Sequence, residues 1–178
     1  MGQGAGSRFE WDPEDYSRTS TMQKKWGREL LEKLHLHGGE RVLDIGCGDG
    51  RLAVEMAKSL PAGSIVGIDS SKEMIAFARR NYPPEDFPNL TWLVMDAKEL
   101  AFEDEFDVVF SNAVLHWITD HRPVLQGIKK ALKPGGRILL QMGGRGNVAE
   151  VVEVLGQIIG RDRWRSYFSD FTFAYGFY

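Results

Sequence analysis

The chain has 178 residues, 43% of them hydrophobic, so it can bury one substantial core but is short for two domains. Its formal net charge of −3 argues against nucleic acid or an anionic membrane as the main partner, because such partners need concentrated Lys and Arg. No apolar run approaches the roughly 18 residues that cross a bilayer, so we expect no membrane span and a small-molecule ligand.

Hydrophobic periodicity predicts that helices and strands alternate along the chain. In chain order we expect helix Thr21–Leu34, strand Arg41–Ile45, helix Asp49–Leu60, strand Ser64–Ile68, helix Lys72–Asn81, strand Thr91–Met95, strand Phe106–Phe110, helix Pro123–Leu132, strand Arg137–Met142 and helix Val148–Ile159. Glycine and proline separate these elements, as in the segment Lys133–Gly136 before the last strand. Such alternation predicts a doubly wound α/β fold around a parallel sheet, whose strands read as continuous apolar runs.

Cys47 is the only cysteine, so no intrachain disulfide can form. A reducing, intracellular setting is the simplest interpretation, and we expect a cytoplasmic protein. The opening letters MGQGAGS differ from a myristoylation signal, because Gly6 stands where that signal has Ser or Thr.

The segment VLDIGCGDG, residues 42–50, joins an apolar strand to a glycine-dense turn. Gly46, Gly48 and Gly50 let the backbone bend and approach a ligand without Cβ obstruction. The helix that follows would point its free N–H groups and the positive end of its dipole at the same ligand. Asp44 either bonds the N–H groups of the turn or contacts the ligand directly. This pattern predicts a site for a nucleotide-like cofactor.

Two cofactor classes compete for this turn, the nicotinamide dinucleotides and S-adenosylmethionine. Both offer a ribose diol to an acid at the end of the second strand, and Asp69 supplies that acid. A dinucleotide fingerprint counted from Gly46 needs a glycine at position 51, where Arg51 stands. The spacing therefore disfavours a nicotinamide oxidoreductase.

Five motifs in order resemble those of the class I S-adenosylmethionine-dependent methyltransferases. They are VLDIGCGDG, then VGIDSSKEMI at the second strand, VMDAKEL after the third, FDVVFSNAVLHW at the fourth and LKPGGRILLQM at the fifth. The resemblance implies a Rossmann-like, mostly parallel sheet of order 3-2-1-4-5 flanked by helices. More narrowly, WDPEDY, SNAVLHW with Asp120-His121 after it, and GGRGN resemble the small-molecule carboxyl methyltransferases related to trans-aconitate and juvenile hormone acid methyltransferases.

The resemblance also implies how the chain is divided. We expect one methyltransferase-type domain over residues 1–178, with an N-terminal lid and helix at 1–39, a cofactor-binding core at 40–160 and an aromatic tail at 161–178. Family members continue past the fifth strand and its helix into two more strands, whereas this chain reaches FTFAYGFY and stops. We expect those two strands to be missing or incomplete, which would leave the apolar surface of the aromatic tail for a partner such as a second copy. A module that binds S-adenosylmethionine without turnover is therefore an alternative to an enzyme.

Carried over by position, the resemblance implies roles for individual residues. The glycines of the turn surround the methionine end of the cofactor, Asp69 accepts both ribose hydroxyls, and Asn112 borders the methionine amine. Asp96 and the backbone of Ala97 face the adenine amine. The complete expected cofactor set is Asp44, Gly46, Cys47, Gly48, Gly50, Asp69, Ser70, Met74, Asp96, Ala97, Asn112 and Tyr16.

Several side chains have two interpretations. Met74 lies against the adenine or belongs to the core, and Trp11 and Tyr16 form a lid over the cofactor or pack as ordinary aromatics. His116 and Trp117 follow the fourth strand on the ligand side of the sheet, where they line an acceptor pocket or simply pack.

The expected reaction is transfer of a methyl group to a small molecule, with a carboxylate oxygen as the preferred acceptor. The sulfonium already activates the methyl group, so the protein mainly aligns the nucleophile and excludes water. His116, the expected catalytic residue with Trp117, would donate a hydrogen bond to a carboxylate or take the proton of a hydroxyl or amine. We expect no metal, since His35 and His37 lack partners at ligand spacing.

Overall fold

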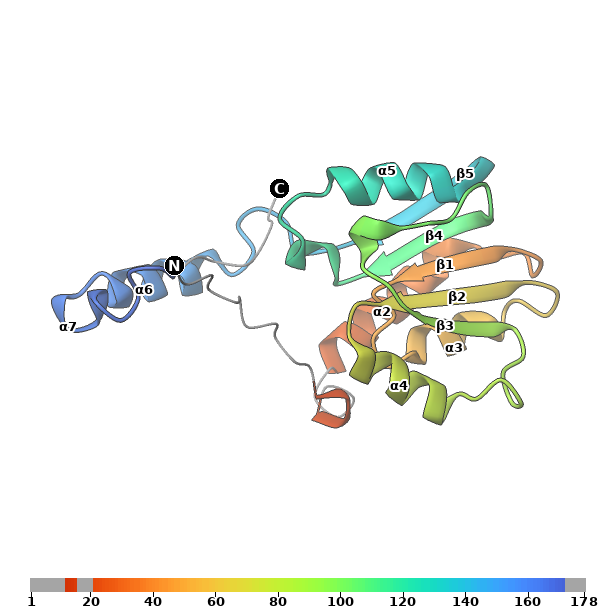
Figure 1. Ribbon diagram of the computed structural model, residues 1–178, viewed down its shortest axis with the longest axis horizontal. Helices are drawn as coiled ribbons and strands as arrows, with labels where there is room; N and C mark the ends of the chain where they lie inside the picture. Colours follow the sequence, from red (N-terminus) through yellow and green to blue (C-terminus); the bar gives the residue numbers. More distant parts are fainter. Residues whose placement is uncertain (1–11, 16–20, 172–178) are drawn as a thin grey trace, which may run out of the picture.

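The computed structural model describes residues 12–15 and 21–171, in which helices and strands alternate as expected (Figure 1). The elements are α2 Thr21–Leu34, β1 Arg41–Ile45, α3 Arg51–Ala57, β2 Ser64–Asp69, α4 Lys72–Asn81, β3 Leu90–Val94, the 3-10 helix η1 Ala97–Glu99, β4 Phe106–Asn112, the 3-10 helix η2 Leu115–Trp117, α5 Arg122–Ala131, β5 Leu132–Gln141, α6 Ala149–Ile159 and α7 Asp162–Arg165. No helix within these ranges is both long enough and apolar enough to span a membrane.

The five strands form one sheet of order β3-β2-β1-β4-β5, and every neighbouring pair is parallel. The predicted strand order is therefore confirmed. β1 lies in the centre, between β2 and β4, so its carboxyl end and the turn that follows meet the middle of the sheet edge. In an open parallel sheet this is where the chain order reverses and where ligands bind.

Two apolar clusters cover the two faces of the sheet, because successive side chains of a strand point to opposite faces. Val42 of β1 belongs to the cluster beneath α2, α3 and α4, whereas Leu43 and Ile45 belong to the cluster beneath α5. Figure 1 shows α5 on one side of the sheet and α2, α3 and α4 on the opposite side. All three β1 side chains are fully buried, as a central strand covered on both faces requires.

The start of β5 differs from the prediction, which placed Lys133–Gly136 in a loop. Leu132 already pairs with Phe106 of β4, and the next pair joins Arg137 to Val108, so β5 carries an irregular bulge between the two pairs. Lys133 contributes to the bulge by holding both oxygens of Asp107 at 2.8 and 2.9 Å. No loop separates α5 from β5, because Leu132 pairs with the sheet directly after the helix, and the bulge lies in the first residues of the strand.

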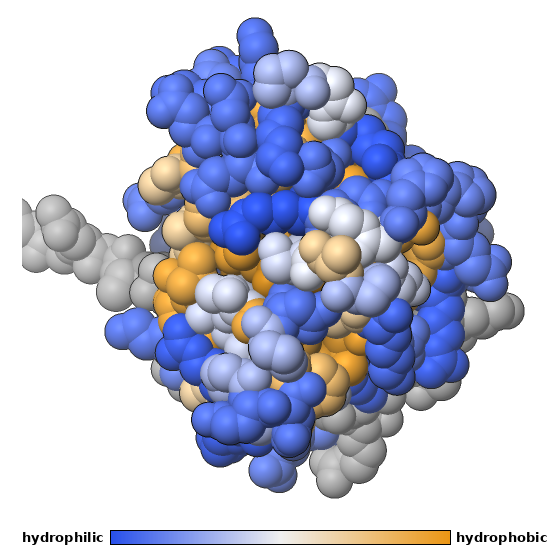
Figure 2. Space-filling model, turned by 90° about the vertical axis from the view of Figure 1, so that its right-hand side faces the viewer, coloured by the Kyte–Doolittle hydropathy of each residue, from blue (hydrophilic) through white to orange (hydrophobic). Residues whose placement is uncertain are grey.

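The end of the molecule where the strands begin has a mostly hydrophilic surface with smaller apolar areas between the polar side chains (Figure 2). Ion pairs lie there, such as Arg41 with Glu105 at 3.1 Å and Arg137 with Glu40 at 3.5 Å. The carboxyl ends of the strands lie on the opposite side of the body, at the edge where open parallel sheets bind ligands.

The C-terminal arm, residues 149–171, projects away from the sheet (Figure 1). It contains α6 and α7, and neither helix has a buried residue. Its exposed apolar side chains are Val151, Val154, Ile158, Trp164, Tyr167, Phe168 and Phe171. Trp164, Tyr167, Phe168 and Phe171 belong to the predicted aromatic tail, whose residues 172–178 lie outside the described ranges.

Candidate functional site

The turn after β1 is held tightly to β2. The backbone N–H groups of Gly46 and Cys47 both donate to the carbonyl of Ile68, at 2.8 and 2.9 Å. Gly46 has φ +71°, and a Cβ there would overlap the side chain of Val114. Gly50 has φ +84°, and a Cβ there would lie 2.8 Å from the Trp92 ring. Glycine is therefore required at position 46, where the turn approaches Val114 in the loop after β4, and at position 50, where the turn packs against Trp92 of the core.

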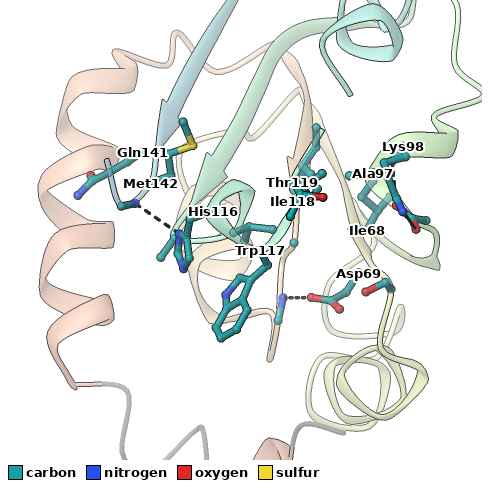
Figure 3. A pocket seen from close by; sticks show the side chains of 18 of the residues that line it. Ile68, Asp69, Ala97, Lys98, His116, Trp117, Ile118, Thr119, Gln141 and Met142 are labelled. Carbon is teal, nitrogen blue, oxygen red and sulfur yellow. Dashed lines mark hydrogen bonds and ion pairs between the residues drawn. The ribbon is translucent and has the colours of Figure 1, made fainter. Parts of the chain in front are cut away.

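A cavity of about 820 Å³ opens beside this turn, at the carboxyl ends of the strands. Nine of the residues predicted for the site line it, namely Gly46, Gly48, Asp69, Ser70, Met74, Asp96, Ala97, His116 and Trp117. The volume falls within the range of roughly 300–1,000 Å³ that is typical of small-molecule sites. The structure therefore brings most of the predicted set into one place (Figure 3).

Asp69, the last residue of β2, ties the turn to the start of α4. Its Oδ2 accepts a hydrogen bond from the Gly48 N–H at 3.0 Å, and its Oδ1 accepts one from the Ser71 N–H at 2.8 Å. Burial raises the pKa of Asp69, and these hydrogen bonds oppose the rise. The carboxylate is therefore fixed in position at the wall of the cavity, where Figure 3 shows it.

Asp96 and Ala97 lie one strand further along the same edge. The Oδ1 of Asp96 accepts the Lys98 N–H at 2.9 Å and so caps η1, and the Lys98 ammonium lies 3.4 Å from its Oδ2. Ala97 is 8% exposed and lines the cavity. Met74, capped at its N–H by Ser71, is buried and also lines the cavity, so its two interpretations are compatible.

His116 and Trp117 form the wall on the β4 side of the cavity (Figure 3). Both belong to η2, and their ring centroids lie 5.4 Å apart. The N–H of Gly143, after β5, donates to His116 Nδ1 at 3.4 Å. Because Nδ1 accepts, a neutral imidazole carries its proton on Nε2. Burial lowers the pKa of His116, which favours that neutral form.

Four of the remaining predicted residues are described by the structure and do not line the cavity. Asp44 is buried in β1 and Cys47 is buried within the turn, Gly50 packs against the core, and Asn112 ends β4. Tyr16 lies outside the described residues, as does Trp11, so the lid stays a prediction.

Asp44 is 2% exposed, and its Oδ2 has no hydrogen-bond partner. Burial, reinforced by the charge of Asp69, raises the pKa of Asp44 to about 7. Burial also raises the pKa of the Cys47 thiol far above its ordinary value, so this thiol is not a reactive nucleophile.

Sequence reasoning missed several lining residues, including Trp26 of α2, Gln141 at the end of β5 and Asn147 beyond it. Gln141 could have been found by the rule that identified Asp69, since both stand at the carboxyl end of a strand. Trp26 lies within the predicted helix Thr21–Leu34, and its place at the cavity follows from how α2 docks. Within the described ranges, no group of three or more His, Cys, Asp or Glu could hold a metal ion.

An open parallel α/β sheet with a cavity at its central carboxyl edge defines a ligand-binding protein of the doubly wound class. A family model described as a methyltransferase domain matches residues 36–166. The chain therefore belongs to the methyltransferase-domain family, and its fold is that of the class I S-adenosylmethionine-dependent methyltransferases.

Two curated relatives illustrate the similarity. The chain is 36% identical over 159 residues to an uncharacterised methyltransferase of Schizosaccharomyces pombe, covering 84% of this chain and 57% of that protein. It is 32% identical over 132 residues to a trans-aconitate 2-methyltransferase of Azoarcus sp., covering 74% and 50%. The chain thus spans about half the length of the curated relatives it matches.

Solved structures support the same family assignment. A phosphoethanolamine N-methyltransferase 2 of Haemonchus contortus, in complex with S-adenosyl-L-methionine, is 29% identical with a TM-score of 0.65, over 86% of this chain and 33% of that one. An S-adenosylmethionine-dependent methyltransferase of Mesorhizobium loti is 28% identical with a TM-score of 0.59, over 65% and 52%.

Proposed function

We propose that the protein transfers the methyl group of S-adenosylmethionine to a carboxylate oxygen of a small molecule. The supporting observation is that one cavity joins two strand-end acids, Asp69 and Asp96, to the ring pair of His116 and Trp117. The acids suit an adenosine, and the rings lie where an acceptor would enter.

The residues present fit the cofactor. Asp69 faces the cavity with a fixed carboxylate that can accept hydrogen bonds from hydroxyl groups, which suits a ribose diol. Asp96, Ala97 and Met74 form an adjoining wall with one acid and two apolar side chains, which suits an adenine. The turn at Gly46 and Gly48 then borders the methionine end. When bound, the cofactor supplies a methyl group that its sulfonium has already activated.

A carboxylate acceptor fits the chemistry of His116. Such an acceptor is already ionised at neutral pH, so it needs a hydrogen-bond donor and no base. His116 presents its Nε2–H as that donor when Nδ1 accepts from Gly143. Several of the relatives, among them those of Azoarcus sp. and Variovorax paradoxus, are trans-aconitate 2-methyltransferases, whose named substrate carries carboxylates.

Calorimetry with S-adenosylmethionine, followed by mass spectrometry of methyl esters formed from a panel of carboxylic acids, tests this function. We expect binding and ester formation. Binding without turnover of any acid would instead support a cofactor-binding module. Failure to bind, or displacement of S-adenosylmethionine by NAD, would overturn the cofactor assignment.

We also propose that the protein acts in the cytoplasm and that the C-terminal arm meets a second copy. The lone Cys47 supports a reducing setting, and the exposed apolar side chains of the arm support a contact. Light scattering tests the contact. We expect a dimer that becomes monomeric in the double variant Val151→Asp, Val154→Asp, and a monomeric parent would contradict it.

A further inference from the structure

Asp44 is a carboxyl group enclosed in the centre of the sheet. In register it lies beside Gly67 of β2 and Phe110 of β4, neither of which offers a polar side chain. The side chain is 2% exposed, and Oδ2 has no hydrogen-bond partner. An ionised carboxylate without a partner is costly in such surroundings, whereas a protonated one is not.

Among the described side chains, no charged or titratable group around the turn stabilises the ionised form of Asp44. Cys47 and Asp49 belong to the turn itself, Arg51 begins α3, and Asp69 ends β2. The guanidinium of Arg51 pairs with Asp49. The thiol of Cys47 stays neutral because burial raises its pKa, and the charge of Asp69 opposes ionisation of Asp44.

We propose that Asp44 is the counter-charge of the cationic methionine end of the cofactor, protonated while the cavity is empty and ionised once the cofactor is bound. This inference rests on the proposed function. Asp44 directly precedes Ile45 and Gly46, which line the cavity, so its charge is placed next to the cavity wall without lining it. S-adenosylmethionine carries a sulfonium and an ammonium against a single carboxylate, and a nearby positive charge favours the ionised acid. Asp44 is accordingly a positioning residue that need not touch the reacting atoms.

The consequence is that cofactor binding releases a proton. With a pKa of about 7, Asp44 is mostly protonated in the empty protein at pH 6.5. By linkage, affinity for S-adenosylmethionine rises with pH below about 7, approaching tenfold per pH unit, and levels off above it. The ammonium of the ligand titrates only near pH 8, so it does not account for a change at lower pH.

Titration calorimetry at pH 6.5 in phosphate and in imidazole buffers measures the released protons, because the observed heat changes with the ionisation heat of the buffer. For the parent with S-adenosylmethionine we expect between half a proton and one proton released. For Asp44→Asn we expect none, although binding persists. Asp49→Asn is the matched control, because Asp49 is also buried in this turn but is paired with Arg51, and it should keep the parental proton release.

Methylthioadenosine separates Asp44 from Asp69 without any variant. This neutral ligand keeps the ribose and adenine but lacks the sulfonium and the amino acid, so we expect it to bind the parent without releasing a proton. Equal release with both ligands would assign the proton to Asp69 at the ribose and overturn the inference. Normal binding of S-adenosylmethionine with no proton release would also overturn it, while leaving the proposed function intact. Absence of binding would refute the proposed function itself.

Discussion

The carboxylate of Asp69 accepts a hydrogen bond from the backbone N–H of Gly48 at 3.0 Å, so the acid that ends β2 holds the turn that follows β1. Its second oxygen accepts from Ser71 at 2.8 Å and holds the residue before α4. One side chain therefore joins three segments at the edge of the cavity. Changing it affects both the position of the turn and any ligand that the turn contacts.

Asp69→Ala should weaken S-adenosylmethionine binding by roughly ten- to a hundredfold, which corresponds to losing about 1.4–2.8 kcal/mol. The loss combines the hydroxyl contacts with the looser turn. Calorimetry measures the dissociation constant. Asp120→Ala is the control, because Asp120 lines the cavity but is paired with Arg122 at 2.8 Å, and its removal should change the constant little. An unchanged constant for the Asp69 variant would remove it from the site.

His116→Ala should lower kcat by about ten- to a hundredfold, the effect of losing one hydrogen bond to a charged group, while leaving S-adenosylmethionine affinity unchanged. Because burial lowers the pKa of His116, the parental rate should not change above pH 7, where the imidazole is already neutral. Initial rates from pH 6 to 9 test this. A variant as fast as the parent contradicts the role of His116, and a rate that rises steadily above pH 7 contradicts the donor assignment.

Gly46→Ala should destabilise the protein by about 2–4 kcal/mol, because alanine is strained at positive φ and its Cβ would overlap Val114. Urea unfolding measures the change. The double variant with Val114→Ala separates the two causes, since it relieves the overlap but not the backbone strain. We expect a favourable coupling energy of about 1–2 kcal/mol between the two sites. Strict additivity would show that Val114 does not constrain the turn.

Asp44→Asn should become increasingly more stable than the parent as pH rises from 5 to 8. The unfolded carboxyl ionises near its ordinary pKa of about 4, whereas in the fold the pKa is about 7. Between these values the folded state binds more protons than the unfolded state, so the parent loses about 1.4 kcal/mol of stability per pH unit, which amounts to about 2–3 kcal/mol over the range from pH 5 to 8. Asparagine does not titrate and avoids this loss.

Urea unfolding of both ligand-free proteins at each pH gives this difference. Asp120→Asn is the control, because the hydrogen bond from Arg122 lowers the pKa of the exposed Asp120 to about 2. That variant should gain no stability over the parent with rising pH. A constant difference between the Asp44 variant and the parent would show that Asp44 is ionised in the empty fold.

Local patterns in the sequence were enough for most of the helices and strands and for the strand-end acids, whereas the strand order was implied by the family resemblance. The helix at 72–81 occurs with the predicted bounds, because its periodicity and the capping Ser71 act within one segment. Asp69 and Asp96 were predicted at the cavity because parallel strands carry their carboxyl ends to one edge. For such features the chain direction alone determines where a side chain lies.

Only the tertiary structure decided the features that depend on distant segments meeting. Leu132 pairs with Phe106 ahead of its expected strand, and Trp26 reaches the cavity because α2 docks beside it. The isolation of Asp44 is of the same kind, since it arises from Gly67 and Phe110 on two other strands. Burial and pairing are properties of the packed neighbourhood, and no local sequence pattern encodes which side chains that neighbourhood will contain.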